Sequence, residues 1–221
     1  MTGGVLVLGV DGWSAHDDDA DLLAHRVREV VRDQLGDVAA AHAVLATHEI
    51  RLAPAHSAVS CVVPDAGLGS DPETVTRRTR AVVAALALAL PGSGSVVASA
   101  PLLSDVVSHG EDTASLTGAW VALAAAATET SGRLVHFDGA EVLVGRLTVA
   151  DVLARSAVDQ VVVVGGLPHD GDTVVDTRGF VRPRVAAGRV TLLVQPAAGG
   201  TVVPFEREHP HRCCEDIVNL G

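Results

Sequence analysis

The end of the chain holds its densest group of residues that could do metal or redox chemistry. His209, His211, Cys213 and Cys214 fall within six consecutive positions. Imidazole and thiolate are the usual protein ligands of zinc and copper, so this segment could bind a divalent metal such as zinc or present a reactive thiol pair. In an extended segment His209, His211 and Cys213 share one face. A solvated tail without a role is the alternative interpretation.

A second group of candidate residues follows three expected strands. Asp11 and His16 follow the first strand, Asp138 the second and His169 the third. In open parallel sheets ligands bind beyond the carboxyl ends of the strands, so parallel neighbours would bring these loops together. We assign His169 as the general base, Asp11 and Asp138 as metal ligands or orienting groups, and His16 as an auxiliary. Turn propensity explains Asp in such loops equally well.

The elements that must position these residues alternate along the chain. Residues 5–10 form a continuous apolar run, which is typical of a strand covered on both faces. Apolar periodicity predicts helices and strands in alternation. The expected helices cover residues 20–35, 71–90, 113–129 and 148–157, and the expected strands cover 43–52, 57–63, 96–100, 134–137 and 160–164. The first two of these middle strands, 43–52 and 57–63, would form a hairpin. Asp71 followed by Pro72 would cap the second helix, and Thr148 with Asp151 would cap the fourth.

The last part of the chain has a different pattern. Residues 174–185 and 189–195 alternate around Gly188, which predicts an antiparallel hairpin. We therefore expect one α/β domain over residues 1–221. Its core, to about residue 170, would be three-layered around a mostly parallel sheet, and an antiparallel C-terminal hairpin extension would follow.

Composition excludes several classes of function. The net charge is −11 and aromatic residues make up 2% of the chain, so it lacks the basic groove and stacking platforms of a nucleic-acid-binding protein. The sequence contains no lysine and no tyrosine, which excludes a Walker lysine, a Schiff base and phenol catalysis. Acid–base chemistry would have to use His, Asp, Glu or Cys.

Cellular location is inferred from equally simple features. The N-terminus lacks the basic region of a signal peptide, and the longest apolar run, residues 81–90, is too short to cross a bilayer. Three cysteines, an odd number, favour a reducing compartment. We expect a cytoplasmic protein that binds a small-molecule ligand and interacts with neither membranes nor nucleic acid. Assembly into a homo-oligomer is compatible with the sequence.

One cluster of positive charge interrupts this acidic sequence. Arg178, Arg182, Arg184 and Arg189 lie within or beside the predicted hairpin. Such arginines could hold a carboxylate or phosphate of a small ligand. The alternative is solvated surface pairing with nearby acids.

Part of the C-terminal sequence resembles a known group of proteins. The stretches Asp176–Pro183 (DTRGFVRP), Pro196–Gly200 (PAAGG) and Val203–Glu206 (VPFE), followed by Cys213-Cys214, resemble the C-termini of a family of uncharacterised actinobacterial proteins. The resemblance covers about forty residues. It implies that the tail belongs to the protein, and it implies no activity.

Three hypotheses follow. The first is a small-molecule enzyme that uses metal-assisted hydrolysis or acid–base chemistry at the strand ends. The second is a non-catalytic metal- or thiol-sensing protein that uses the C-terminal His and Cys residues. The third is a structural domain that binds a partner.

Overall fold

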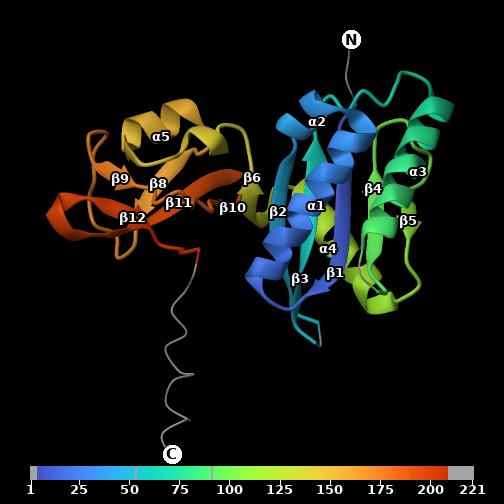
Figure 1. The fold of residues 1–221 in the computed structure, drawn as a ribbon, viewed down its shortest axis with the longest axis horizontal. Coiled ribbons are helices and arrows are strands. Elements are labelled where there is room, and N and C mark those ends of the chain that lie inside the picture. The colour runs from blue at the N-terminus through green and yellow to red at the C-terminus, as the bar shows by residue number, and fades with distance from the viewer. Residues whose placement is uncertain (1–3, 53, 91, 209–221) are drawn as a thin grey trace, which may run out of the picture.

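The computed structural model describes residues 4–52, 54–90 and 92–208, and its chain path is shown in Figure 1. The helices are α1 (Asp17–Leu35), α2 (Asp37–Ala41), α3 (Pro72–Ala89), α4 (Thr113–Ala127) and α5 (Val149–Arg155). The strands of the first half are β1 (Leu6–Ser14), β2 (Val44–Ile50), β3 (His56–Val63), β4 (Ser95–Ser99) and β5 (Val107–His109). Those of the second half are β6 (Ser131–His136), β7 (Arg146–Thr148), β8 (Gln160–Val163), β9 (Val174–Asp176), β10 (Arg184–Ala186), β11 (Arg189–Pro196) and β12 (Val202–Pro204).

The described strands form one sheet of twelve, in the order β5-β4-β1-β3-β2-β6-β10-β11-β12-β9-β7, with β8 paired to β11. Only β8 with β11 and β12 with β9 pair in parallel among the described ladders. The prediction of a three-layer α/β fold around a mostly parallel sheet is therefore wrong. The antiparallel turn around Gly188 is confirmed, because β10 pairs with β11, but residues 174–176 of the predicted first arm form β9, which pairs with β12 and β7 instead.

The physical reason for the error is visible in the first unit, which spans β1 to α4. Helix α1 connects β1 to β2, and the two strands run in the same direction, as the alternating pattern suggests. Strand β3 nevertheless lies between them in the sheet and pairs antiparallel with both. Strand β4 pairs antiparallel with the other side of β1. This is the split β-α-β-β-α-β arrangement, in which every adjacent pair is antiparallel although each crossover connects parallel strands.

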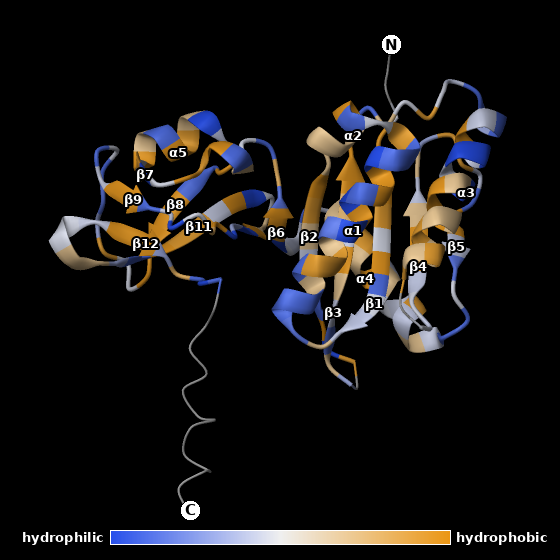
Figure 2. Cartoon of the chain, viewed as in Figure 1, coloured by the Kyte–Doolittle hydropathy of each residue, from blue (hydrophilic) through white to orange (hydrophobic). Residues whose placement is uncertain are grey.

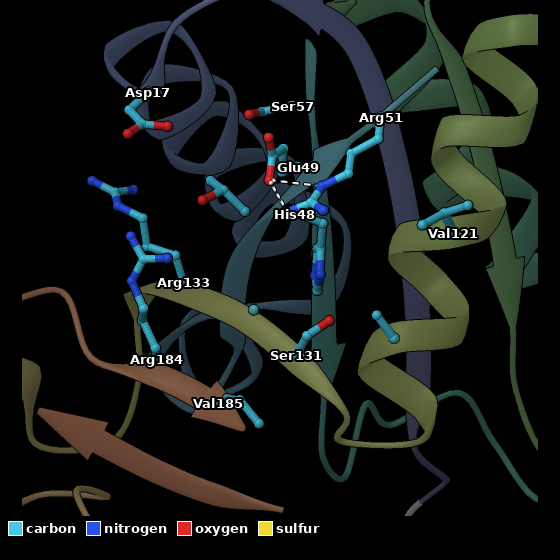
Figure 3. Close-up of a pocket in the computed structure, with 13 residues that line it drawn as sticks. Asp17, His48, Glu49, Arg51, Ser57, Val121, Ser131, Arg133, Arg184 and Val185 are labelled. Atoms are coloured by element: carbon cyan, nitrogen blue, oxygen red, sulfur yellow. Dashed lines mark hydrogen bonds and ion pairs between the residues drawn. The ribbon is translucent and has the colours of Figure 1, made fainter. Parts of the chain in front are cut away.

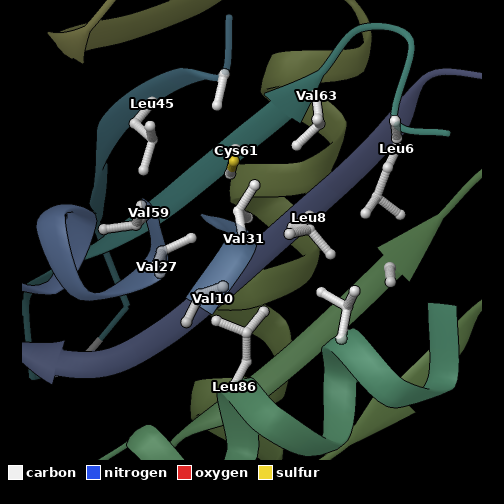
Figure 4. Packing of buried hydrophobic residues seen from close by; sticks show 14 of the residues in the cluster. Leu6, Leu8, Val10, Val27, Val31, Leu45, Val59, Cys61, Val63 and Leu86 are labelled. Atoms are coloured by element: carbon white, nitrogen blue, oxygen red, sulfur yellow. The ribbon is translucent and has the colours of Figure 1, made fainter. Parts of the chain in front are cut away.

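Two helices cover one face of this sheet. Leu6, Leu8 and Val10 of β1 point toward α1 and α3 and are fully buried. Val27 and Val31 of α1 and Leu86 of α3 close the same cluster, which Figure 4 shows from close by. The predicted caps are confirmed: the Asp71 carboxylate accepts the Thr74 N–H, and Thr148 and Asp151 form a capping box.

Helix α4 covers the opposite face, so β1 has helices on both sides as its apolar sequence indicates. Its inner face carries Gly118, Ala119 and Ala122, all buried, which lets the helix lie close to the sheet. A Cβ on Gly9 of β1 would overlap the Ala119 carbonyl oxygen, so this crossing requires glycine at that position.

The second unit begins at β6, which pairs with β2 on one side and β10 on the other. It has its own apolar cluster around Leu134, Phe137, Val152 and Leu192, beneath α5. Figure 2 shows hydrophobic residues concentrated in the strands of both units. Most apolar residues of 134–170 therefore pack with the C-terminal strands, although Val135 belongs to the cluster of the first unit and Ala46 of β2 to this one. No helix within the described ranges is long and apolar enough to cross a membrane.

Candidate ligand site where the sheet divides

The two units separate at one end of the β2–β6 ladder. Pairing runs from Leu45 with His136 to Thr47 with Arg133, and the ladder ends there. Strand β2 continues to Ile50 beside β3, whereas β6 continues back to Ser131 beside β10. The two strands diverge, and the C-terminal half of α4 lies across the gap. This division creates the space in which the candidate site lies.

Two adjoining cavities occupy this space. The first has a volume of about 560 Å³ and a polar lining that includes His48, Glu49, Arg51, Arg133 and Arg184 (Figure 3). The second has a volume of about 460 Å³ and a mainly apolar lining. They share the lining residues His48, Ala125, Ser131 and Val185. We call the two cavities together the groove.

His48 is the polar side chain at the junction of the two cavities. In Figure 3 it lies between Arg133 and Arg184 on one side and Val121 of α4 on the other. The residue is 5% exposed. Its Nε2 lies 2.7 Å from Oγ of Ser60, a diagonal neighbour on β3, whereas its Nδ1 is buried without a hydrogen-bond partner among the described residues. An unpaired buried nitrogen of this kind costs about 1–3 kcal/mol.

Burial also determines the charge of His48. Desolvation lowers the pKa of this imidazole from 6.5 to about 4. The ring is therefore neutral at pH 7, with one nitrogen that donates and one that accepts. Ser60, 2% exposed, can complement either arrangement because a hydroxyl both donates and accepts.

An arginine–carboxylate network forms one wall of the polar cavity. Arg133 of β6 donates to Asp21 of α1 and to Glu206, and it is 7% exposed. Arg182 also donates to Asp21, at 2.9 and 3.0 Å. Burial lowers the pKa of Arg133, but the hydrogen bonds and charges of its two carboxylate partners outweigh this and raise the pKa overall. Arg184 is half-exposed and reaches Glu206 only at 3.5 Å.

A second polar pair is buried elsewhere under α4. Nε2 of His56 lies 2.7 Å from Oδ2 of Asp11, and both residues are buried. Nδ1 of His56 must carry a proton because its partner, at 2.8 Å, is the Pro54 carbonyl oxygen. Burial raises the pKa of Asp11, and hydrogen bonds from the backbone N–H of Trp13 and from His56 offset part of that rise. A Cβ on Gly118 would overlap the Asp11 carboxylate, so this pair is enclosed by the helix.

The structure does not bring the sequence-predicted residues together. Strands β1 and β6 are separated by β3 and β2 and run in opposite directions, so Asp11 and Asp138 lie toward opposite ends of the sheet. Asp138 is exposed and lies 3.3 Å from Nδ1 of His42. His169 belongs to the second unit and donates from Nε2 to the Val161 carbonyl at 2.8 Å. His16 is the exposed N-cap of α1.

The predicted metal residues have a different status. His209, His211, Cys213 and Cys214 lie outside the described residues. Within the described ranges, no three His, Cys, Asp or Glu side chains are placed to hold a metal ion. The remaining cysteine, Cys61, is fully buried, and burial raises the pKa of its thiol to about 12.

The sequence interpretation missed the residues of the groove. His48 and Ser60 lie in the expected strands 43–52 and 57–63. The sequence held a signal that His48 is buried, because by period-2 alternation it shares a face with Val44, Ala46 and Ile50. Of the predicted arginine cluster, Arg182 and Arg184 do converge on carboxylates, and Arg133 joins them from the next strand.

Comparisons with known proteins add little to this description. No protein-family model matches the chain, and no curated protein matches it. Among solved structures, a phage SAM lyase in its apo state is similar at 16% identity and a TM-score of 0.33, covering 50% of this chain and 92% of that protein. At this TM-score the likeness supports no conclusion about the fold or activity of this chain.

Proposed function

We propose that the protein binds a small organic molecule in the groove, with an apolar body in the inner cavity and a polar group on Nδ1 of His48. The observation that supports this most directly is that the buried His48 lines both the polar and the apolar cavity, while its Nδ1 has no hydrogen-bond partner among the described residues. A hydrogen-bonding ligand would remove the cost of leaving that atom unpaired.

The dimensions and lining of the groove support the same function. Cavities of several hundred Å³, mainly apolar with a few convergent polar groups, are typical of small-molecule sites. The inner cavity is lined by Val44, Ala46, Leu134, Phe137 and Val190, and the outer one by arginine and glutamate side chains. A ligand would therefore bury its apolar part and direct its polar part toward the rim.

The pKa of His48 favours a recognition role over a catalytic one in the ligand-free protein. A general base works best when its pKa is close to the working pH, and a value of about 4 leaves the imidazole a weak base at pH 7. A neutral imidazole is nevertheless a good hydrogen-bonding group. We infer that His48 orients a hydroxyl or amide of the ligand.

Phenol and toluene provide a matched pair of probes, because they differ mainly in one hydroxyl group. We expect phenol to bind several-fold more tightly than toluene, since one hydrogen bond contributes about 1 kcal/mol net. Ala125→Leu, which fills the junction of the two cavities, should abolish binding of both probes. Ala124→Leu, exposed on the same helix, is the control. Equal binding to both variants would contradict the proposal.

Acid–base catalysis is a second candidate, favoured by the 2.7 Å distance between Nε2 of His48 and Oγ of Ser60. A histidine at this distance can accept the proton of a serine hydroxyl as the oxygen attacks a carbonyl carbon. An acceptor of the bound substrate on Nδ1–H would strengthen the base. Hydrolysis of p-nitrophenyl acetate by the native protein, lost in Ser60→Ala and retained in Ser57→Ala, would support this chemistry. Unchanged hydrolysis in Ser60→Ala would contradict it.

Metal or thiol chemistry of the C-terminal segment is an independent proposal. His209, His211, Cys213 and Cys214 supply the ligand types that zinc prefers, and the proposal rests on those residue types and their spacing alone. It needs no contribution from the groove, so the two functions can be tested separately.

A further inference from the structure

A third cavity lies on the other side of the Arg133–Arg184 wall. Its volume is about 680 Å³, and it shares Asp17, Arg133 and Arg184 with the polar cavity of the groove. Phe180, Leu192, Leu193, Pro204 and Phe205 supply its apolar lining. We call it the arginine cavity.

Three guanidinium groups converge on this cavity from separate segments. Arg133 comes from β6, Arg184 from β10, and Arg182 from the loop before β10, where its guanidinium lies 4.2 Å from the centre of the Phe180 ring. Two carboxylates, Asp21 and Glu206, contact them. Among the described residues, these three cations have two carboxylates in contact, and Asp17, Asp18 and Arg207 also line the cavity.

Asp21 and Glu206 differ in how they occupy this network. Asp21 is fixed on α1 and accepts hydrogen bonds from both Arg133 and Arg182. Glu206 follows β12, in a segment whose last backbone hydrogen bond to the sheet, among the described residues, is Phe205 N–H to the Leu193 carbonyl. One carboxylate oxygen of Glu206 accepts from Arg133, whereas Oε2 is buried, has no hydrogen bond within the described ranges and lies 3.5 Å from Arg184.

The incomplete contact between Glu206 and Arg184 indicates that another carboxylate could replace the Glu206 carboxylate. Arginine and carboxylate pair best through two parallel hydrogen bonds, and Glu206 does not make that pair with Arg184. Arg184 is half-exposed, so its other donors are accessible from the cavity. The rim charges of Arg207, Asp17 and Asp18 are exposed and screened by solvent, so they affect a bound anion less than the largely buried Arg133 and Arg182 do.

We propose that the arginine cavity binds a small organic carboxylate with an apolar or aromatic body, and that Glu206 occupies the position of that carboxylate in the ligand-free protein. The ligand would displace Glu206 from Arg133 and Arg184, place its carboxylate there, and pack its body against Phe180 and Phe205. Displacement would also release the chain that follows β12. The site is separate from the His48 groove and does not depend on that function.

Benzoate is the probe for this site, and benzyl alcohol is the neutral control. At constant ionic strength, calorimetric titration should show benzoate binding about ten-fold more tightly to Glu206→Gln than to the native protein, because a tethered carboxylate competes at an effective concentration in the millimolar range. Glu208→Gln, which removes a neighbouring exposed carboxylate, should bind as the native protein does. Benzyl alcohol should bind all three proteins equally.

Three results would overturn the proposal. The first is equal benzoate affinity of Glu206→Gln and Glu208→Gln. The second is a rise in benzyl alcohol affinity in Glu206→Gln as large as the rise in benzoate affinity. The third is no benzoate binding to any of the proteins. Hydrogen exchange of the native protein gives a test that needs no variant: saturating benzoate should accelerate exchange of the Phe205 amide, which donates to the Leu193 carbonyl, and unchanged or slower exchange there would also overturn the proposal. Ala125→Leu should leave benzoate binding to Glu206→Gln unchanged, so failure of the His48 groove is distinguishable from failure here.

Discussion

Nε2 of His48 and Oγ of Ser60 form a 2.7 Å hydrogen bond between diagonal neighbours of two antiparallel strands. The ladder pairs His48 with Ala58 and Ala46 with Ser60, so both polar side chains lie on the face that α4 covers. Most other residues on that face are small or apolar. The fold therefore retains a polar pair in a position where apolar residues would pack without a desolvation cost.

Removing the serine hydroxyl should destabilise the fold. Ser60→Ala leaves both ring nitrogens of His48 without a protein partner, so we expect the free energy of unfolding to fall by about 1–3 kcal/mol. The double variant His48→Phe with Ser60→Ala replaces both partners by apolar groups and should recover part of that loss. Urea denaturation measures both changes. A double variant less stable than Ser60→Ala would contradict the account.

The depressed pKa of His48 predicts a specific pH dependence of stability. The folded imidazole titrates at about 4 and the unfolded one at 6.5, so between these values the unfolded chain binds a proton that the folded chain does not. The stability present above pH 6.5 is thus lost as the pH falls toward 4, by about 3 kcal/mol. The His48→Phe, Ser60→Ala variant should lack this component. Parallel pH profiles for the two proteins would show that His48 is not buried as described.

Two histidine–aspartate pairs offer a comparison of buried and exposed contacts. Asp11→Ala leaves Nε2 of His56 and the backbone N–H of Trp13 without their partner inside the protein. We therefore expect the free energy of unfolding to fall by about 3–5 kcal/mol. Asp138→Ala removes the exposed contact with His42 and should cost less than about 1 kcal/mol. Thermal unfolding of the two variants measures this difference. Similar losses would mean that Asp11 is not enclosed beneath α4.

The C-terminal segment can be tested by elemental analysis. If His209, His211 and Cys213 hold a metal, purified full-length protein should contain about one zinc per chain, the stoichiometry of a single site. Deletion of residues 209–221 should remove it. Zinc retained after the deletion, or absent from the full-length protein, would contradict a metal site in this segment.

Local structure could be predicted from the sequence much better than the arrangement of strands. The Asp71-Pro72 and Thr148/Asp151 signals depend on contacts within one turn, and both helices begin where those signals predict. The β2–β3 hairpin was also predicted, because a short turn connects two apolar segments. The insertion of β3 between β1 and β2 depends on packing between distant segments. A parallel and a split arrangement therefore produce the same alternation of strand and helix patterns.

The candidate site was missed for the same reason. His48 is far in sequence from Ala125 and Arg133, and it meets them only because β2 and β6 diverge beneath α4. Asp11 was singled out from the sequence as a polar residue with a role. In the structure it is buried against His56 within the sheet and does not lie in a loop at the strand end. Residue type indicated where polar chemistry lies, and long-range pairing decided which residues meet.

The most direct test of the central claim is nitrogen-15 NMR of the His48 ring during titration with phenol. We predict that the Nδ1 resonance of His48 shifts progressively to saturation, because this buried nitrogen gains a hydrogen-bond partner, and that the ring nitrogens of the closed His56 pair do not shift. The shift should be absent in Ala125→Leu and present in Ala124→Leu. An Nδ1 resonance that stays constant while phenol saturates the native protein would contradict the account.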